Sequence, residues 1–97
     1  MELEGKKAAI LVEKLYNEYE FIYPYYRLQE AGTRVTVVGA EKGATYAGKY
    51  GLPVTADAGA GEVSAADYDA VVIPGGYAPD HMRRHSAMVD LVRGMNA

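Results

Sequence analysis

The sequence predicts an α/β domain built on a doubly wound parallel sheet. Three short apolar runs, at residues 7–12, 34–38 and 69–73, have the length and the β-branched content of buried strands. A segment with helical periodicity, residues 18–31, separates the first run from the second. A strand, a helix and a strand within about 35 residues form a βαβ unit, whose crossover is right-handed. We expect the 7–12 strand to lie between the other two.

The helix at residues 18–31 is expected to start after Asn17. Asn17 and Glu20, three residues apart, resemble a capping box. Pro24 predicts a kink, or a regular helix that begins only near it. The apolar face of this helix is expected to contain four large side chains, which are Ile22, Tyr25, Tyr26 and Leu28.

The rest of the chain predicts smaller elements. Glycines punctuate residues 43–55, which favours a small β-hairpin at the margin of the sheet. Residues 58–62 are expected to form a loop of small residues, and residues 64–67 a single capped turn. A short helix at residues 79–84 and a longer one from Ser86 to about Met95 are expected after the third strand.

Composition narrows the functional classes. A chain of 97 residues makes at most one domain. Its content of 49% hydrophobic and 24% charged residues is typical of globular proteins and not of disordered ones. A net charge of −3 argues against nucleic-acid or anionic-lipid partners. No run is apolar enough for a signal peptide or a membrane span, so we expect a cytoplasmic protein. No phosphate-cradling motif is present, and we expect no cofactor.

The segment Ile73-Pro74-Gly75-Gly76 is the most informative candidate site. Ligands of open parallel sheets bind beyond the carboxyl ends of the strands. Glycines there let backbone N–H groups approach a substrate, and they could form half of an oxyanion hole. The same residues also fit a plain tight turn.

Glu18 and Glu20 follow the first strand and are expected at the same end of the sheet. A carboxylate in that place can act as an acid, as a base or as the partner of a nucleophile. The alternative is that both residues cap the helix and interact with its dipole.

Two further groups of residues favour structural interpretations. His81 and His85 are four residues apart and close to Asp80, but no third metal ligand is evident, so we expect an exposed turn and no metal site. Five of the nine tyrosines lie between residues 16 and 26, and we expect them to serve packing or a subunit interface. The chain has no cysteine, so it supplies neither a thiol nucleophile nor a thiolate metal ligand.

Four segments resemble the ThiJ/PfpI family of intracellular proteases in order and spacing. They are Glu-Tyr-Glu-Phe-Ile-Tyr-Pro-Tyr-Tyr-Arg-Leu at 18–28, Gly-Lys-Tyr-Gly at 48–51, Asp-Tyr-Asp-Ala at 67–70 and Val-Ile-Pro-Gly-Gly-Tyr-Ala-Pro-Asp at 72–80. The resemblance covers essentially all 97 residues. It implies a flavodoxin-like three-layer sandwich whose nucleophile is a cysteine in an Ala-Ile-Cys-His-Gly segment.

The resemblance also implies roles for individual residues. The glutamate that matches Glu20 hydrogen-bonds the cysteine, and the glycines that match Gly75 and Gly76 flank the oxyanion site. An acid that matches Asp80 reaches a histidine of the neighbouring subunit. Family members are described as cysteine peptidases, as glyoxalases or deglycases, or as stress chaperones. The implied substrate is a small molecule or a peptide.

Two departures from the family pattern stand out. Asn17 occupies a position where these proteins usually carry an additional acid. The chain also ends before the segment that would carry the cysteine. We therefore expect residues 1–97 to be the N-terminal part of a single domain, as a fragment or one chain of a split cysteine-dependent hydrolase. A homo-oligomer or a complementary C-terminal chain is the expected partner, and a stable lone monomer is not expected. A non-catalytic partner-binding module and a stress chaperone remain the alternatives.

Overall fold

The computed structural model describes residues 5–75 and 86–95. The elements, in chain order, are β1 (Lys7–Leu11), α1 (Glu18–Glu30), β2 (Arg34–Gly39), β3 (Thr45–Ala47), β4 (Pro53–Thr55), β5 (Ala58–Gly59), the 3₁₀ turns η1 (Ala60–Glu62) and η2 (Ala65–Asp67), β6 (Ala70–Val72) and α3 (Ser86–Met95). Within these ranges, no helix combines the length and the apolar character that crossing a membrane requires.

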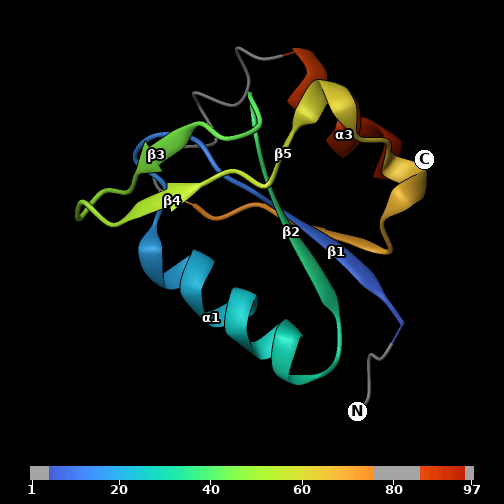
Figure 1. Ribbon diagram of the computed structural model, residues 1–97, viewed down its shortest axis with the longest axis horizontal. Helices are drawn as coiled ribbons and strands as arrows, with labels where there is room; N and C mark the ends of the chain where they lie inside the picture. The colour runs from blue at the N-terminus through green and yellow to red at the C-terminus, as the bar shows by residue number, and fades with distance from the viewer. Residues whose placement is uncertain (1–4, 76–85, 96–97) are drawn as a thin grey trace.

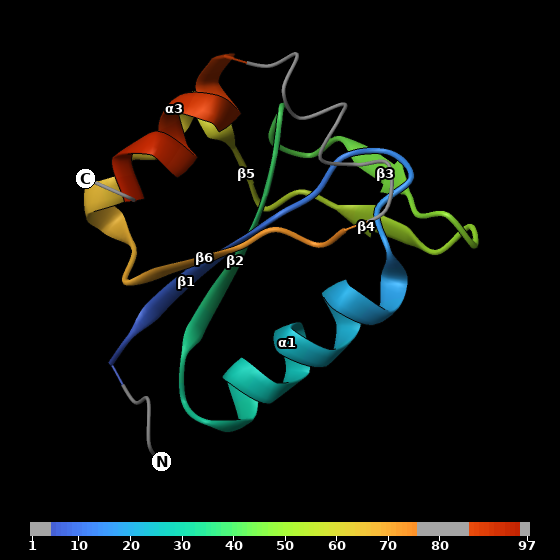
Figure 2. The same ribbon diagram turned by 180° about the vertical axis from the view of Figure 1, so that it is seen from behind.

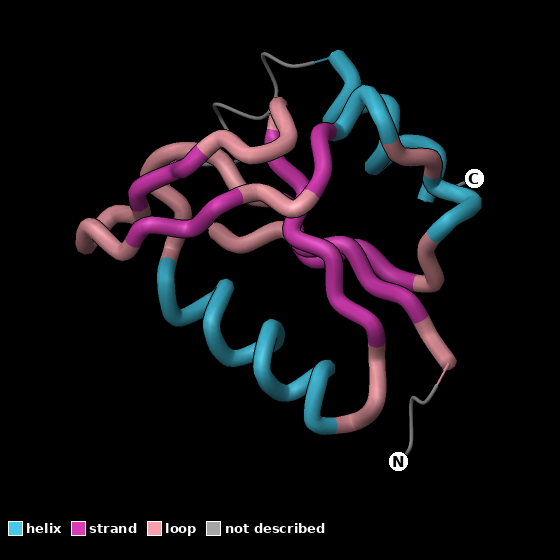
Figure 3. Tube along the Cα trace, in the orientation of Figure 1, coloured by secondary structure: helices cyan, strands magenta, loops and turns pink. Residues whose placement is uncertain are grey.

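Four parallel strands form the central sheet in the order β5-β2-β1-β6 (Figure 1). β1 lies between β2 and β6, as the sequence predicted, and Figure 2 shows these three strands from behind. α1 covers one face of the sheet, whereas α3 and the 3₁₀ turns cover the other (Figure 3). The predicted doubly wound α/β architecture is confirmed.

The core is centred on β1, because this strand has neighbours on both edges and cover on both faces. Its residues from Ala8 to Leu11 are at most 1% exposed. Around them pack Val37 and Val38 of β2, Phe21 of α1, and Met88 and Leu91 of α3. This explains why the strand sequence is apolar without alternation, as expected for a parallel strand buried on both faces.

α1 runs without interruption from Glu18 to Glu30, with Pro24 inside it, so the later start offered as one option is wrong. The predicted apolar face is also partly wrong. Ile22 and Tyr26 are 37% and 62% exposed, whereas Phe21 is buried and Tyr25 is half-buried. The Phe21 ring lies 5.3 Å from that of Tyr25 and 5.4 Å from that of Tyr16, which is fully buried. This aromatic contact, with spacing i and i+4, sets the buried side of the helix.

Residues 58–62 are not the predicted loop. Ala58 and Gly59 form β5, which extends the sheet beside β2, and η1 follows directly. Two hydrogen bonds between Asp57 and Val37 fix the start of β5 beside β2. The Asp57 N–H donates to Val37 O (2.8 Å), and the Val37 N–H donates to the Asp57 carboxylate (2.9 Å). A strand of two small residues is held by backbone pairing, so side-chain propensity gave no sign of it.

The remaining predicted elements are confirmed, except the helix expected at residues 79–84, which lies outside the described residues. β3 and β4 form the antiparallel hairpin expected between residues 43 and 55. The turn at 64–67 is capped by Ser64, whose hydroxyl accepts the Ala66 N–H and whose N–H donates to the Asp67 carboxylate. α3 occupies the predicted residues 86–95.

The start of α1 anchors the loop of the hairpin, residues 48–52, which connects β3 to β4. The Tyr16 hydroxyl donates to Leu52 O at 2.8 Å, and Lys49 N–H donates to Tyr16 O at 2.9 Å. The Glu18 carboxylate accepts the N–H groups of Tyr50 (2.8 Å) and Leu52 (3.1 Å) through Oε2. Three residues of the hairpin loop, Lys49, Tyr50 and Leu52, are thus tied to Tyr16 just before the helix and to Glu18 at its N-terminus.

Glu18 is a buried carboxylate, 5% exposed. Burial acts to raise its pKa, but hydrogen bonds from the backbone N–H groups of Leu52, of Glu18 itself and of Tyr50 outweigh it and hold the pKa below its usual value. Burial, together with the nearby Glu18 carboxylate, raises the pKa of Tyr16 to about 12. Ionised Glu18 and neutral Tyr16 are therefore the states that hold the hairpin.

The lowered pKa of Glu18 predicts a loss of stability in acid. The ordinary value is 4.5, so the contribution of Glu18 is complete above that pH and disappears as the pH falls through the lower folded-state pKa. We expect Glu18→Gln to lower the free energy of unfolding at neutral pH and to weaken the fall of that free energy as the pH drops below 4.5, the ordinary value of the pKa. Urea unfolding at several pH values measures both effects. Glu30→Gln, at an exposed position of the same helix, is the control. Equal pH profiles for the Glu18 variant and the parent would contradict the assignment.

Gly48 leaves the space that the Glu18 carboxylate fills. A β-carbon at position 48 would collide with that carboxylate, which cannot move without losing its two backbone hydrogen bonds. We expect Gly48→Ala to destabilise the protein by about 1–3 kcal/mol. Gly61→Ala is a matched control, because its β-carbon would meet no atom, and its effect should stay within about 0.5 kcal/mol. Thermal or urea unfolding distinguishes them, and equal stability of both variants would rule out the close contact.

Candidate functional site

Glu20 and Gly75, two residues singled out in the sequence, meet at the carboxyl end of the sheet. Gly75 N–H donates to Glu20 Oε1 at 2.7 Å. Glu20 lies in the first turn of α1, after β1, and Gly75 follows the end of β6. Because β1 and β6 are parallel neighbours, their carboxyl ends open at the same edge, which brings the two residues together.

Asn17 is hydrogen-bonded to both Glu20 and Gly75. Its Oδ1 accepts the N–H groups of Tyr19 (3.0 Å) and Glu20 (3.2 Å), so Asn17 caps α1 as predicted. Its own N–H donates to Gly75 O at 3.0 Å, and the Glu20 side chain turns to Gly75 instead of to Asn17. The second half of the predicted capping box is therefore wrong, because Gly75 provides the partner of both the Asn17 N–H and the Glu20 carboxylate.

Gly75 is a glycine because of the approach of Glu20. A β-carbon at this position would lie 2.7 Å from Glu20 Oε1, closer than two such atoms can come. The plain-turn interpretation leaves this contact unexplained. The N–H group of Gly75 is engaged by the Glu20 carboxylate, so in this structure it orients an acid rather than pointing into open space.

Glu18, although only two residues from Glu20, belongs to a different part of the molecule. Two positions apart on a helix is about 200° of rotation, so the two carboxylates face different neighbours. Glu18 faces the hairpin loop, whereas Glu20 faces Gly75. Residue type and spacing offered both as candidates, and the family resemblance alone singled out Glu20.

The other predicted site residues, Gly76 and Asp80, lie outside the described residues, as do His81 and His85. In residues 5–75 and 86–95, no group of three or more acidic or histidine side chains is arranged to hold a metal ion. Of the site residues predicted from the sequence, Glu20 is thus the one whose carboxylate the described structure places at the carboxyl end of the sheet against Gly75.

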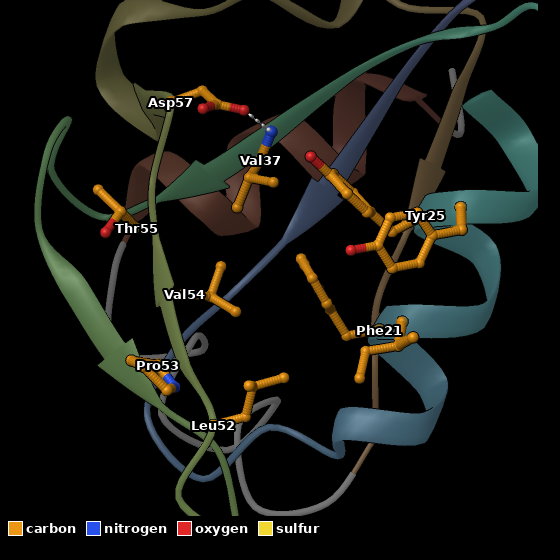
Figure 4. A pocket seen from close by; sticks show the side chains of 10 residues that line it. Phe21, Tyr25, Val37, Leu52, Pro53, Val54, Thr55 and Asp57 are labelled. Carbon is orange, nitrogen blue, oxygen red and sulfur yellow. Dashed lines mark hydrogen bonds between the residues drawn. The ribbon is translucent and has the colours of Figure 1, made fainter.

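A cavity of about 350 Å³ lies between α1 and the β3–β4 hairpin (Figure 4). Its walls are mainly apolar and aromatic, with Phe21 and Tyr25 from the helix facing Leu52 and Val54 from the hairpin. The carboxylate of Asp57 reaches its rim but accepts the Val37 N–H. Neither Glu20 nor Gly75 lines this cavity, so the molecule presents an apolar surface and a carboxylate site in separate places.

Solved structures with this fold include proteins of the DJ-1 type. A two-domain protein of Anabaena variabilis, with a DJ-1/ThiJ/PfpI-like and a ferritin-like domain, is 46% identical, with a TM-score of 0.87 over 91% of this chain and 26% of its own. Drosophila melanogaster DJ-1beta is 32% identical, with a TM-score of 0.81 over 91% of this chain and 48% of its own.

Sequence relatives agree with the structural ones. General stress protein 18 of Bacillus subtilis is 38% identical over 90 residues, which are 92% of this chain and 52% of that protein. An uncharacterised Staphylococcus aureus protein is 40% identical over 78 residues, 80% of this chain and 46% of the relative. The chain thus spans about half the length of these relatives. The model of the DJ-1/PfpI family matches residues 6–97, and the chain therefore belongs to that family.

Proposed function

We propose that this chain supplies the carboxylate part of a cysteine-dependent hydrolase site, of the peptidase or the glyoxalase and deglycase type. The observation that carries the proposal is the 2.7 Å hydrogen bond that fixes Glu20 against Gly75 at the carboxyl edge of the sheet. The cysteine would come from a family-type segment that is not among these 97 residues. The substrate class would be a small carbonyl compound or a peptide.

The role proposed for Glu20 is to hydrogen-bond the thiol. One carboxylate oxygen accepts the Gly75 N–H, and because Oε2 has no hydrogen bond from the residues that the structure describes, it would be the atom that meets the thiol. In this role the Glu20 carboxyl group would be protonated and would donate its proton in a hydrogen bond to the thiolate, which would stabilise the anion and increase the reactive fraction at neutral pH. Gly75 would orient Glu20 and, with Gly76, border the oxyanion. Asp80 would support a histidine of a second subunit.

The alkylation rate of the thiol tests this role. In the protein together with its cysteine-bearing segment, Glu20→Gln keeps a hydrogen-bond donor, so we expect it to retain most of the reactivity with iodoacetamide. Glu20→Leu keeps the bulk but loses the polar group, and we expect alkylation at neutral pH to fall roughly 10- to 100-fold, the equivalent of one charge-assisted hydrogen bond. The measurement is the rate as a function of pH. Identical pH profiles for the three proteins would make Glu20 a structural residue only.

A second candidate function is stress-related binding of unfolded polypeptides. Tyr19 and Tyr23 on α1 are 76% and 72% exposed, and the apolar cavity opens beside the same helix. Exposed tyrosines next to an apolar groove are typical of surfaces that bind extended apolar segments. One relative carries the name general stress protein, which agrees with a role of this kind.

Aggregation assays separate this candidate from catalysis. We expect Tyr23→Ser to reduce suppression of the heat-induced aggregation of a model client, measured by light scattering, because it removes exposed aromatic area. Tyr23→Phe keeps that area and should behave as the parent. No suppression by the parent protein, or equal suppression by both variants, would reject the tyrosine face as a binding surface.

A further inference from the structure

Leu15 is the one residue other than glycine with a positive φ in the part of the chain that the structure describes, and its φ is 64°. It forms a turn with Lys14 between β1 and α1. A residue with a β-carbon is strained in this left-handed region, and turns with this backbone favour glycine or asparagine at such a position. A leucine here therefore lowers the stability of the turn.

Packing in the core does not explain the leucine. The Leu15 side chain is 39% exposed, whereas Glu13 and Tyr16 on either side of the turn are buried. The turn is held by its backbone, because the Leu15 N–H donates to Ala47 O at 2.9 Å. Any residue except proline can make this hydrogen bond. Neither the core nor the turn therefore requires a leucine at this position.

The position of the turn in the fold supplies a reason. β1 is the switch point of the sheet, since the chain crosses from it to β2 on one side while β6 pairs with it on the other. Ligands of such sheets bind in the crevice beyond the carboxyl ends of the strands at this point. Leu15 is two residues from Asn17, whose N–H donates to Gly75 O at 3.0 Å, so the Cα atoms of Leu15 and Asn17 are at most about 7 Å apart. Leu15 thus lies at the border of the Glu20–Gly75 site.

We propose that Leu15 is a specificity-determining residue, whose apolar side chain favours substrates with an apolar group beside the reacting carbonyl. The proposal deepens the hydrolase function proposed above and rests on it. Strained backbone is concentrated at ligand-binding sites, where the surrounding structure holds it in place. Contact with an apolar group would remove the exposed part of Leu15 from water, and a strongly polar substrate would not make this gain.

Alkylation of the thiol by two reagents tests this selectivity, in the protein together with its cysteine-bearing segment. The rate with the N-phenyl derivative of iodoacetamide is divided by the rate with iodoacetamide, and N-acetylcysteine gives the reference ratio. We expect the parent to exceed this reference. Leu15→Asn should lower the ratio roughly three- to sevenfold, because the exposed 39% of the side chain leaves about two fifths of the burial free energy of a leucine to be gained. Leu15→Met keeps an apolar side chain and should keep the parental ratio.

The stability of Leu15→Asn separates this role from packing. Asparagine adopts the left-handed region more readily than leucine, so we expect the midpoint of thermal unfolding to rise by about 2 °C or more. A leucine that is needed for packing would give the opposite result. A lower midpoint, or a variant that does not fold, would overturn the proposal.

The outcomes distinguish this proposal from the hydrolase function. An unchanged ratio in Leu15→Asn, with altered pH profiles in the Glu20 variants, would overturn the role of Leu15 and leave the function standing. A lower ratio, with parental pH profiles in the Glu20 variants, would reject the function and support Leu15 as an apolar contact at the thiol. A thiol that reacts with neither reagent in the parent would reject both.

Discussion

Pairing of β1 on both of its edges is the constraint on which the arrangement of this molecule depends. Ile10 stands opposite Val37 of β2 and opposite Val72 of β6, and all three strands run in the same direction. The chain therefore leaves β1 and β6 at the same edge, where Asn17 and Gly75 come within hydrogen-bonding distance. A shift of one residue in the β1–β6 register would reverse the faces of β6 and separate these groups. The apolar sequence of β1 thus determines where a polar site can form.

A second, polar constraint acts at the other side of α1. Tyr16 and Glu18 are buried and bind the backbone of the hairpin loop, and Leu52 of this loop forms one wall of the apolar cavity together with β4. Buried polar groups stabilise a structure only when their hydrogen bonds are made, so the hairpin and the helix start depend on each other. Glu18 at the start of α1 binds the hairpin, and Glu20 binds Gly75. A single helix therefore contributes to both the cavity and the candidate site.

Much of the fold follows from local sequence patterns, and much of the site does not. The strands, the hairpin and the Asn17 cap were predictable because apolar runs, glycine turns and N-caps act over a few residues. β5 escaped prediction because two small residues gain their structure from the backbone of β2. The separate partners of Glu18 and Glu20 are residues 32 to 55 positions away along the chain, which no local pattern records. The family resemblance identified Glu20, and only the three-dimensional arrangement showed that it binds Gly75.

The hydrogen bond between Glu20 and Gly75 also bears on the order in which the molecule folds. Its partners are 55 positions apart, whereas those of Glu18 are 32 and 34 apart, and β1, α1 and β2 occupy one continuous stretch. Contacts between nearby segments close at a smaller entropic cost than contacts between distant ones. The βαβ unit and its hairpin can therefore assemble first, with the Glu20 carboxylate still in water. The candidate site then forms as β6 docks on β1, after the βαβ unit to which Glu20 belongs.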